Sequence, residues 1–306
     1  MSGDYRLAIA GTACPLTRDS LVLIDALKEK RIEASKINWS DYLAHPSEFD
    51  GVLIRECWDY HLNINDYVSW LQSLDKNGIP VFNTVPDILR NLDKSYLKTL
   101  ISDGFNVIPT EFLSVAGDFS KALFSISDKS KSEYIVLKPC ISASSHNTFK
   151  ISVNNEKEIQ NKAEFILKDS PVLIQPFFEE VLHQGEISLI FIDGHYSHAV
   201  RKKPARGDFR VSSRFGGEYE AYSPCPDLRK TGRELLEHCA PGSLYARLDG
   251  IIRNGTFHIM EVELNEPYLF FDVSPDSYEY FSQALRQRLD KSFRSKQDGG
   301  IRKLAS

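Results

Sequence analysis

The first 86 residues show short apolar runs that alternate with longer amphipathic segments. In one such segment Leu23, Ala26 and Leu27 recur at helical spacing, and in another the pattern ends at Gly78, a common helix terminator. Strands that alternate with helices are typical of an open parallel sheet. We therefore expect an α/β unit with strands at residues 5–10, 34–39, 51–54 and 79–82 and helices at 19–30 and 66–77.

From residue 87 the pattern changes to short strands in pairs, with fewer helices between them. The dipeptides Asp193-Gly194 and Asn254-Gly255 each separate two apolar runs, which indicates a hairpin turn. We expect an α+β architecture here, with a single helix between residues 110 and 168. The expected strands are 134–139, 172–175, 187–192, 195–200, 244–252 and 256–264, and the expected helices are 93–103, 156–167, 229–238 and 278–289.

The composition is that of a globular protein, with 42% hydrophobic and 26% charged residues among 306. A net charge of −5 gives no support for a nucleic-acid or anionic-membrane surface. No apolar run approaches the ~18 residues of a membrane helix, and the start, MSGDYRLAIAGTACP, lacks the features of a signal peptide. Residues 291–306 are polar and basic without an apolar period, so we expect a flexible tail there.

The cysteines are scattered and odd in number, and no Cys or His spacing indicates a zinc site. Reduced thiols in a cytoplasmic protein fit this pattern best. The five cysteines are Cys14, Cys57, Cys140, Cys225 and Cys239.

The most informative segment is RLDGIIRNGTFHIMEVELNEP, residues 247–267, because it places acidic residues in otherwise apolar strands. Side chains alternate between the two faces of a strand, so Glu261 and Glu263 point the same way. Whether Asp249 on the preceding strand joins them depends on the turn that connects the two strands.

Two turns are compatible with this hairpin. A two-residue Asn254-Gly255 loop would pair Asp249 with Met260, whose side chain points to the other face. A three-residue loop at 254–256 would pair Asp249 with Glu261 and is a common hairpin type. We expect the three-residue loop.

In that register Arg247, Asp249, Glu261 and Glu263 share one face of the strand pair. Three converging carboxylates repel one another unless a cation binds, and hard oxygen ligands suit Mg²⁺, which also takes water and substrate phosphates. The alternative is an exposed polar face that Arg247 and other basic residues neutralise.

Two lysines are candidates for contacts with phosphate groups. Lys94 lies near the start of a predicted helix, and Lys138 ends the apolar strand YIVLKP, where an unpaired lysine is unusual. The loop after Lys138 contains Ser142, Ser144 and Ser145, and it could close over phosphates with backbone N–H groups and hydroxyls. Each of these features also fits an ordinary polar surface.

Two further segments carry candidates for nucleotide binding. QPFFEEVLHQGE, residues 175–186, could stack an adenine ring on its apolar side chains, with Glu186 on the ribose; a linker between subdomains is the alternative. RKKPARGDFR, residues 201–210, is a basic turn whose cations suit polyphosphate or a carboxylate, or form a solvated charge run. Gly216-Gly217 follows and would let a ligand approach the backbone closely.

The motif RECWDY, residues 55–60, follows an apolar strand. Arg55 could meet a substrate carboxylate at the carboxyl end of that strand, where open α/β sheets bind ligands. Trp58, Tyr60 and His146 are further candidates for substrate contact. Alternatively, the two aromatic residues pack a domain interface, Arg55 pairs with an acid, and His146 is exposed.

Taken in this order, the segments resemble the ATP-grasp superfamily over roughly residues 87–271. The motifs RECWDY, SHAVRKKP and EVELNEP are similar to a bacterial subgroup that includes the O-ureido-D-serine cyclo-ligase of cycloserine biosynthesis. More distant similarity extends to glutathione synthetase and D-alanine–D-alanine ligase. The resemblance implies a pre-ATP-grasp domain at 1–86, central and C-terminal ATP-grasp subdomains at 87–175 and 176–290, and the tail at 291–306.

The resemblance also implies roles for the candidates. Asp249, Glu261 and Glu263 would hold two Mg²⁺ ions, which Mn²⁺ could replace, and Arg247 and Arg210 would stabilise the transferring phosphoryl group. ATP would contact Lys94, Lys138, Ser142, Ser144, Ser145, Gln175, Pro176, Phe177, Phe178, Glu186 and Lys202. Substrate would contact Arg55, Trp58, Tyr60, His146, Gly216 and Gly217.

The sequence departs from the family pattern at two points. The phosphate loop is rich in Ser where many relatives have Gly, and Glu263 stands where several relatives have Asn, which adds a negative charge. The implied activity is ATP-dependent activation of a small carboxylate or amino acid as an acyl phosphate, followed by C–N bond formation between or within molecules. A homodimer is one form of assembly to expect. The alternatives are a small-molecule kinase and a nucleotide-binding regulatory protein without turnover.

Overall fold

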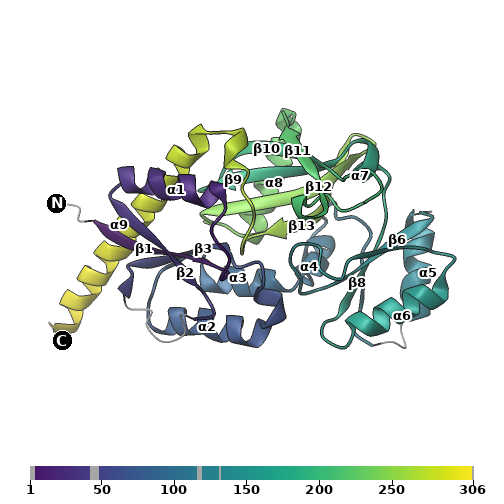
Figure 1. The fold of residues 1–306 in the computed structure, drawn as a ribbon, viewed down its shortest axis with the longest axis horizontal. Coiled ribbons are helices and arrows are strands. Elements are labelled where there is room, and N and C mark those ends of the chain that lie inside the picture. Colours follow the sequence, from purple (N-terminus) through teal and green to yellow (C-terminus); the bar gives the residue numbers. More distant parts are fainter. Residues whose placement is uncertain (1–3, 42–47, 116–118, 131, 305–306) are drawn as a thin grey trace.

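The computed structural model describes residues 4–41, 48–115, 119–130 and 132–304, without the side chains of 127–129 and 295–304. Three sheets with their covering helices make up this part of the chain, and each sheet is built from one continuous stretch of sequence (Figure 1). The first sheet is parallel and the other two are antiparallel, which confirms the expected mixed α/β architecture.

The N-terminal sheet has the strand order β2-β1-β3-β4 and is buried on both faces, as parallel sheets usually are. Leu7 and Ile9 pack toward α1 and the C-terminal helix α9 (Asp276–Leu304), whereas Ala8 and Ala10 pack toward α2 and α3. The elements are β1 (Tyr5–Gly11), α1 (Arg18–Glu29), β2 (Ile32–Asn38), β3 (Gly51–Glu56), η2 (Tyr60–Leu62), α2 (Ile64–Lys76), β4 (Val81–Phe82) and α3 (Val85–Leu92).

The second sheet has the order β5-β8-β6-β7, and α5 and α6 pack against it. The expectation of a single helix between residues 110 and 168 was wrong, because α5 lies there as well as α6. Apolar residues recur at helical spacing in α5, but the serines between them weaken its helix propensity. The elements are α4 (Tyr96–Ser102), β5 (Glu111–Leu113), α5 (Phe119–Ser130), β6 (Tyr134–Pro139), β7 (Phe149–Ser152), α6 (Glu156–Ile166) and β8 (Val172–Pro176).

The third sheet has the order β11-β10-β9-β12-β13, and side-chain alternation divides it into an apolar and a polar face. Leu189, Phe191 and Leu248 pack with α4 and α8 in one core cluster. Arg247 and Asp249 therefore project from the opposite face. The elements are α7 (Glu180–His183), β9 (Glu186–Ile192), β10 (His195–Lys203), η4 (Ser213–Phe215), β11 (Glu218–Ala221), α8 (Pro226–Cys239), β12 (Tyr245–Arg253), β13 (Thr256–Glu263) and η5 (Phe271–Val273).

Helix α9 returns from the third sheet to the N-terminal sheet and contacts α1, so both ends of the chain lie on the same side of the molecule (Figure 1). Helix α9 continues through the predicted tail to Leu304, and the flexibility of this tail stays a prediction. No proline interrupts this stretch, and the Phe293 ring contacts Tyr5. Residues 305 and 306 lie outside the described residues.

No helix in the described part of the chain is long and apolar enough to cross a membrane.

Candidate active site

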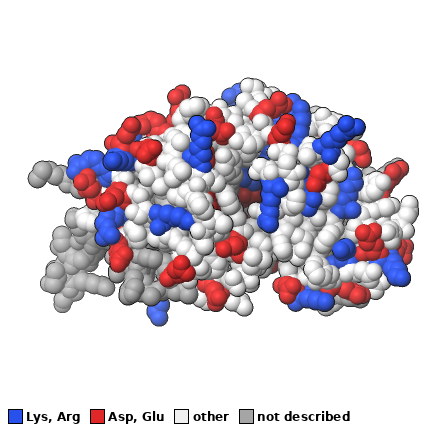
Figure 2. Space-filling view, in the orientation of Figure 1, with Lys and Arg blue, Asp and Glu red and all other residues white. Residues whose placement is uncertain are grey.

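A cavity of about 810 Å³ is lined by residues of the second and third sheets and by Thr17, Trp58, Tyr60 and Asn91 from loops and helices of the N-terminal part. The molecule is hollowed near the middle of the face shown in Figure 2, with Lys and Arg side chains beside the hollow. The volume falls within the usual range for small-molecule sites. Among the predicted residues, the lining includes Trp58, Tyr60, Lys94, Lys138, Ser142, Ser144, Ser145, Gln175, Pro176, Phe177, Phe178, Glu186, Lys202, Arg210, Arg247, Asp249, Glu261 and Glu263.

The predicted acidic face of the hairpin is present, but the turn that produces it differs from the predicted one. Asp249 pairs with Glu261, and Arg247 pairs with Glu263, so the predicted pairing is confirmed. The loop, however, has two residues, Asn254-Gly255, both at positive φ. The prediction of a three-residue loop was therefore wrong.

A β-bulge supplies the missing residue. The register shifts between Asp249 and Gly250, and Met260 is the extra residue on β13. A bulge places two residues opposite one and re-aims the side chains beyond it. Glu261 is consequently brought to the face of Asp249.

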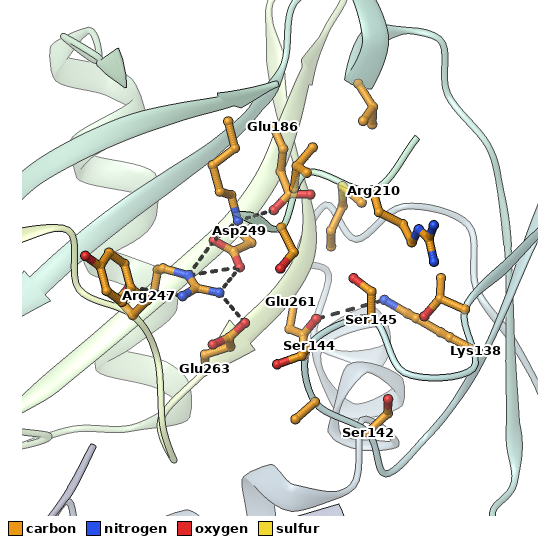
Figure 3. Close-up of a pocket in the computed structure, with 18 of the residues that line it drawn as sticks. Lys138, Ser142, Ser144, Ser145, Glu186, Arg210, Arg247, Asp249, Glu261 and Glu263 are labelled. Atoms are coloured by element: carbon orange, nitrogen blue, oxygen red, sulfur yellow. Dashed lines mark hydrogen bonds and ion pairs between the residues drawn. The ribbon is translucent and has the colours of Figure 1, made fainter. Parts of the chain in front are cut away.

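Arg247 is the central cation of this face. Its guanidinium donates to Asp249 through Nε and Nη2, at 3.1 and 3.0 Å, and to the backbone oxygen of Tyr268 at 3.0 Å. It also pairs with the carboxylate of Glu263 (Figure 3). One planar guanidinium thus holds two carboxylates in place.

Asp249 and Glu186 share Lys202. The ammonium nitrogen of Lys202 lies 2.5 Å from Glu186 Oε1 and 3.4 Å from Asp249 Oδ1, and the Ser188 hydroxyl donates to Asp249. Burial would raise the pKa of Asp249, but Arg247 and Lys202 lower it well below its usual value. Asp249 is therefore an anion across the physiological pH range.

Glu261 faces the two predicted phosphate lysines. Lys94 Nζ lies 3.1 Å and Lys138 Nζ 4.0 Å from its carboxylate oxygens. Lys94 also donates to the backbone oxygen of Ser142 at 2.9 Å, which ties the Ser-rich loop to the carboxylate face. Burial lowers the pKa of Lys138, because its attraction to Glu261 only partly offsets the loss of solvent.

The carboxylates fit a hard cation by their chemistry, although they are spread among basic partners. Within the described part of the chain, no three Asp, Glu, His or Cys side chains are grouped so as to hold a metal ion. Burial raises the pKa of Glu263 to about 7, with Arg247 opposing the shift and Asp249 and Glu261 adding to it. A bound divalent ion would favour the charged form of Glu263.

The Ser-rich loop lies over the acidic face. Ser144 and Ser145 both have positive φ, near 52° and 56°, and the Ser142 hydroxyl donates to the backbone oxygen of His146 at 2.9 Å. Ser142, Ser144 and Ser145 of this loop line the cavity next to Lys138 (Figure 3). The loop is in place to contact anionic oxygens.

An apolar compartment adjoins β8. Phe177 and Phe178 are buried there with Ile108 and Ile251, and Gln175 donates to Thr110 Oγ1 at 3.0 Å. The Phe209 ring meets Phe177 edge to face, with 6.0 Å between ring centroids. Flat aromatic walls beside backbone polar groups suit a purine ring.

Arg210 lines the cavity, but its guanidinium is bound by a neighbour. It donates to Asp208 through Nε and Nη2, at 3.0 and 2.7 Å, and it lies 3.5 Å from the centroid of Phe215. Figure 3 shows it across the cavity from Arg247 and Glu263. The predicted catalytic role of Arg210 stays a prediction.

Four predicted substrate residues do not line the cavity. Arg55 is 2% exposed and pairs with Asp19 at 3.2 Å, so its expected contact with substrate is contradicted. His146 packs against His61, with 4.8 Å between ring centroids. Gly216 and Gly217 shape the loop after η4: the first has φ of 78°, and a Cβ on the second would clash with the backbone of Val211.

The sequence interpretation missed several cavity residues, and two of them lie in the motif that carries the resemblance. Asn265 and Glu266 directly follow the predicted ligands, and both line the cavity. Burial, and next Glu263, raise the pKa of Glu266 to about 8. The only signal was two polar residues between Leu264 and Pro267, within the motif that carries the resemblance.

A cavity between two antiparallel sheets, with Lys94 and Lys138 facing the carboxylates of the third sheet, is the arrangement of a nucleotide-dependent ligase of the ATP-grasp class. The chain belongs to the ATP-grasp family, because residues 106–265, more than half of it, match the model described as "Prokaryotic glutathione synthetase, ATP-grasp domain". Residues 7–83 match the model "D-cycloserine synthetase DcsG, N-terminal domain".

Individual proteins confirm the predicted family and fold. "Cycloserine biosynthesis protein DcsG" of Streptomyces lavendulae is 26% identical over 305 residues, covering 94% of this chain and 99% of that protein. The crystal structure of D-cycloserine synthetase DcsG has a TM-score of 0.83 at 25% identity, over 93% of this chain and 99% of the other. D-alanine–D-alanine ligase from Bacillus anthracis in complex with ATP has a TM-score of 0.66 at 17% identity, over 97% and 100%, and so shows the fold alone.

Proposed function

We propose that the chain is an ATP- and Mg²⁺-dependent ligase that activates a small carboxylate, or the carboxyl group of an amino acid, and joins it to nitrogen. One observation carries this proposal: Arg247, Asp249, Glu261 and Glu263 share one face of the cavity, opposite Lys94 and Lys138. The names of the relatives support a small amino-acid product, because two of them refer to cycloserine.

The side chains at one end of the cavity suit a nucleotide. Phe177 and Phe209 would enclose the adenine ring, and Glu186 would accept from the ribose hydroxyls. Lys94, Lys138 and the Ser-rich loop would bind the phosphates. Lys202 would add a further positive charge to the phosphate site, next to Asp249.

Asp249, Glu261 and Glu263 would hold the magnesium ions. Bound Mg²⁺ neutralises phosphate charge and orients the phosphate for transfer. Arg247 would hold Asp249 and Glu263 in place and stabilise negative charge on the transferring group.

The reaction would have two bond exchanges. A substrate carboxylate oxygen attacks the γ-phosphorus of ATP, the bond to ADP breaks, and an acyl phosphate forms. A nitrogen then attacks the acyl carbon, the carbon–oxygen bond to phosphate breaks, and the nitrogen loses a proton to the departing phosphate. The product gains a C–N bond and loses the elements of water to ATP hydrolysis.

The test is a screen of amino acids and small carboxylates, including O-ureido-D-serine, for release of ADP and inorganic phosphate, with mass spectrometry of the products. A ligase releases free phosphate and forms a dehydrated product, a kinase keeps the phosphate on its product, and a regulatory protein shows no turnover. Asp249→Asn should abolish turnover while circular dichroism shows that the fold is intact. Asp75→Asn, an exposed change on α2, is the matched control. Full turnover in Asp249→Asn would refute the metal assignment.

A further inference from the structure

Glu266 is the one cavity carboxylate in the described structure that has no hydrogen-bond or ion-pair partner. The other four each have a basic neighbour. Those pairs are Glu186 with Lys202, Asp249 with Arg247 and Lys202, Glu261 with Lys94 and Lys138, and Glu263 with Arg247. A partly buried carboxylate without a partner is costly, and a cationic ligand would remove that cost.

The neighbouring residue gives a second, independent observation. Asn265 is 4% exposed and lines the cavity. Its Oδ1 accepts from the hydroxyl of Tyr67 at 2.7 Å, whereas its amide Nδ2 has no partner among the described residues. A buried amide donor without an acceptor costs about 1–3 kcal/mol, which a ligand oxygen nearby would offset.

The two residues lie at the junction with the N-terminal domain. The Trp58 indole donates to the backbone oxygen of Glu266 at 3.1 Å, and Trp58 and Tyr60 line the same cavity. Aromatic rings beside a carboxylate favour the binding of a cationic group. Burial, and next the charge of Glu263, raises the pKa of Glu266, so Glu266 lies near the proposed phosphoryl-transfer face.

We propose that Glu266 determines substrate specificity by accepting hydrogen bonds from an ammonium group of the substrate, while the Asn265 amide donates to an oxygen of the same molecule. An acceptor next to a donor matches the ammonium and carboxyl groups that an amino acid carries on one carbon. This inference rests on the proposed function, because it places the substrate beside the acidic face. Glu266 would then be the residue that selects a cationic substrate over a neutral one.

The test compares pairs of ligands that differ only in the ammonium group. The pairs are D-alanine with propionate, and O-ureido-D-serine with its analogue that has hydrogen in place of the ammonium group. Binding is measured by calorimetry on the full chain with Mg²⁺ and a non-hydrolysable ATP analogue. The expected wild-type preference for the ammonium-bearing member is about 10- to 100-fold, the size of one charge-assisted interaction.

Glu266→Gln should reduce that preference to less than about threefold, because the amide keeps the size of the side chain without its charge. Glu266→Asp should keep part of it, which a purely structural role of the side chain would not predict. The affinity for the ATP analogue should stay unchanged in both variants. Glu186→Gln, a carboxylate at the other end of the cavity, should weaken nucleotide binding and leave the ammonium preference intact.

The inference is overturned if the wild-type chain shows no preference in either pair, or if Glu266→Gln keeps the full preference. Loss of Mg²⁺-nucleotide affinity in Glu266→Gln with the preference retained would make this residue a metal ligand instead. The proposed function fails separately, when the wild-type chain neither binds the nucleotide nor releases phosphate with any carboxylate.

Discussion

Asp249 pairs with Glu261 across β12 and β13, although the turn that joins these strands has only two residues. The bulge at Met260 makes this pairing possible, and the surrounding chain holds the bulge in place. Ile259 exchanges backbone hydrogen bonds with Asn106 and Ile108, at 2.8 and 3.0 Å. The face that would bind metal therefore depends on contacts outside the hairpin.

Gly250 is the residue where the register shifts, and Gly250→Ala should disturb it. A Cβ at this position would clash with the backbone oxygen of His258 and the ring of Phe257. We expect a loss of about 2 kcal/mol or more in the free energy of unfolding and at least a 10-fold loss of phosphate release. Denaturant titration and steady-state kinetics would measure the two effects.

Gly255→Ala is the matched control for that change. Gly255 has φ of 77°, but a Cβ there would meet open space. The expected cost is about 1 kcal/mol of backbone strain, without a shift of the register. Equal losses of turnover in both variants would argue against a special role of the bulge.

The fold was easier to predict from the sequence than the site. Periods of two and 3.6 residues are local signals, and strands such as β6 were found with their observed bounds. The alternation of Glu261 and Glu263 is equally local. The bulge at Met260 has no such local signal, because the same sequence also fits a three-residue loop. Only tertiary contacts decide between that loop and the two-residue loop with a bulge. Glu266 was missed because two polar residues before a proline have no period.

Phe209 should contribute to nucleotide affinity. Its ring lines the apolar compartment and contacts Phe177 edge to face. Because an aromatic wall contributes about 1–3 kcal/mol when a base stacks on it, Phe209→Ala should raise KM for ATP about 10-fold or more with a smaller change in kcat. Phe124→Ala, at a ring that is 74% exposed on α5, is the control and should leave both constants unchanged.

His61 should make the chain less stable in mild acid. Burial, and next the charges of His146 and Lys94, lower its pKa to about 4, while Asp59 opposes the shift. Both ring nitrogens lack a partner among the described residues. Between pH 6.5 and 4 the unfolded chain binds a proton that the folded His61 does not, so stability falls as the pH falls through this window.

Replacing His61 by Asn should reduce this pH dependence. The fall in Tm between pH 7.5 and pH 5 should be smaller in His61→Asn than in the wild type, as scanning calorimetry at a series of pH values would show. His195→Asn, at an exposed position on β10, should leave the fall unchanged. An identical fall in His61→Asn and the wild type would contradict the expectation.

Arg55 should act in stability rather than in substrate binding, contrary to the role that its place at the carboxyl end of β3 suggested. The sequence could not reveal its partner, because Asp19 lies 36 residues earlier, in the first turn of α1. Both side chains are almost fully buried, and Asp19 also accepts from the backbone of Phe271 and the hydroxyl of Tyr278. The pair thus ties the N-terminal sheet to the segment that leads into α9.

Arg55→Met should cost about 3–5 kcal/mol in the free energy of unfolding, because it leaves the Asp19 carboxylate buried without its cation. The double variant Asp19→Asn, Arg55→Met should lose clearly less than the sum of the two single losses, since it removes both charges together. Denaturant titration of all four proteins measures this coupling. Arg206→Met, an exposed change in the turn after β10, should be neutral. A normal unfolding free energy in Arg55→Met, together with a raised KM for the carboxylate substrate, would restore the substrate role.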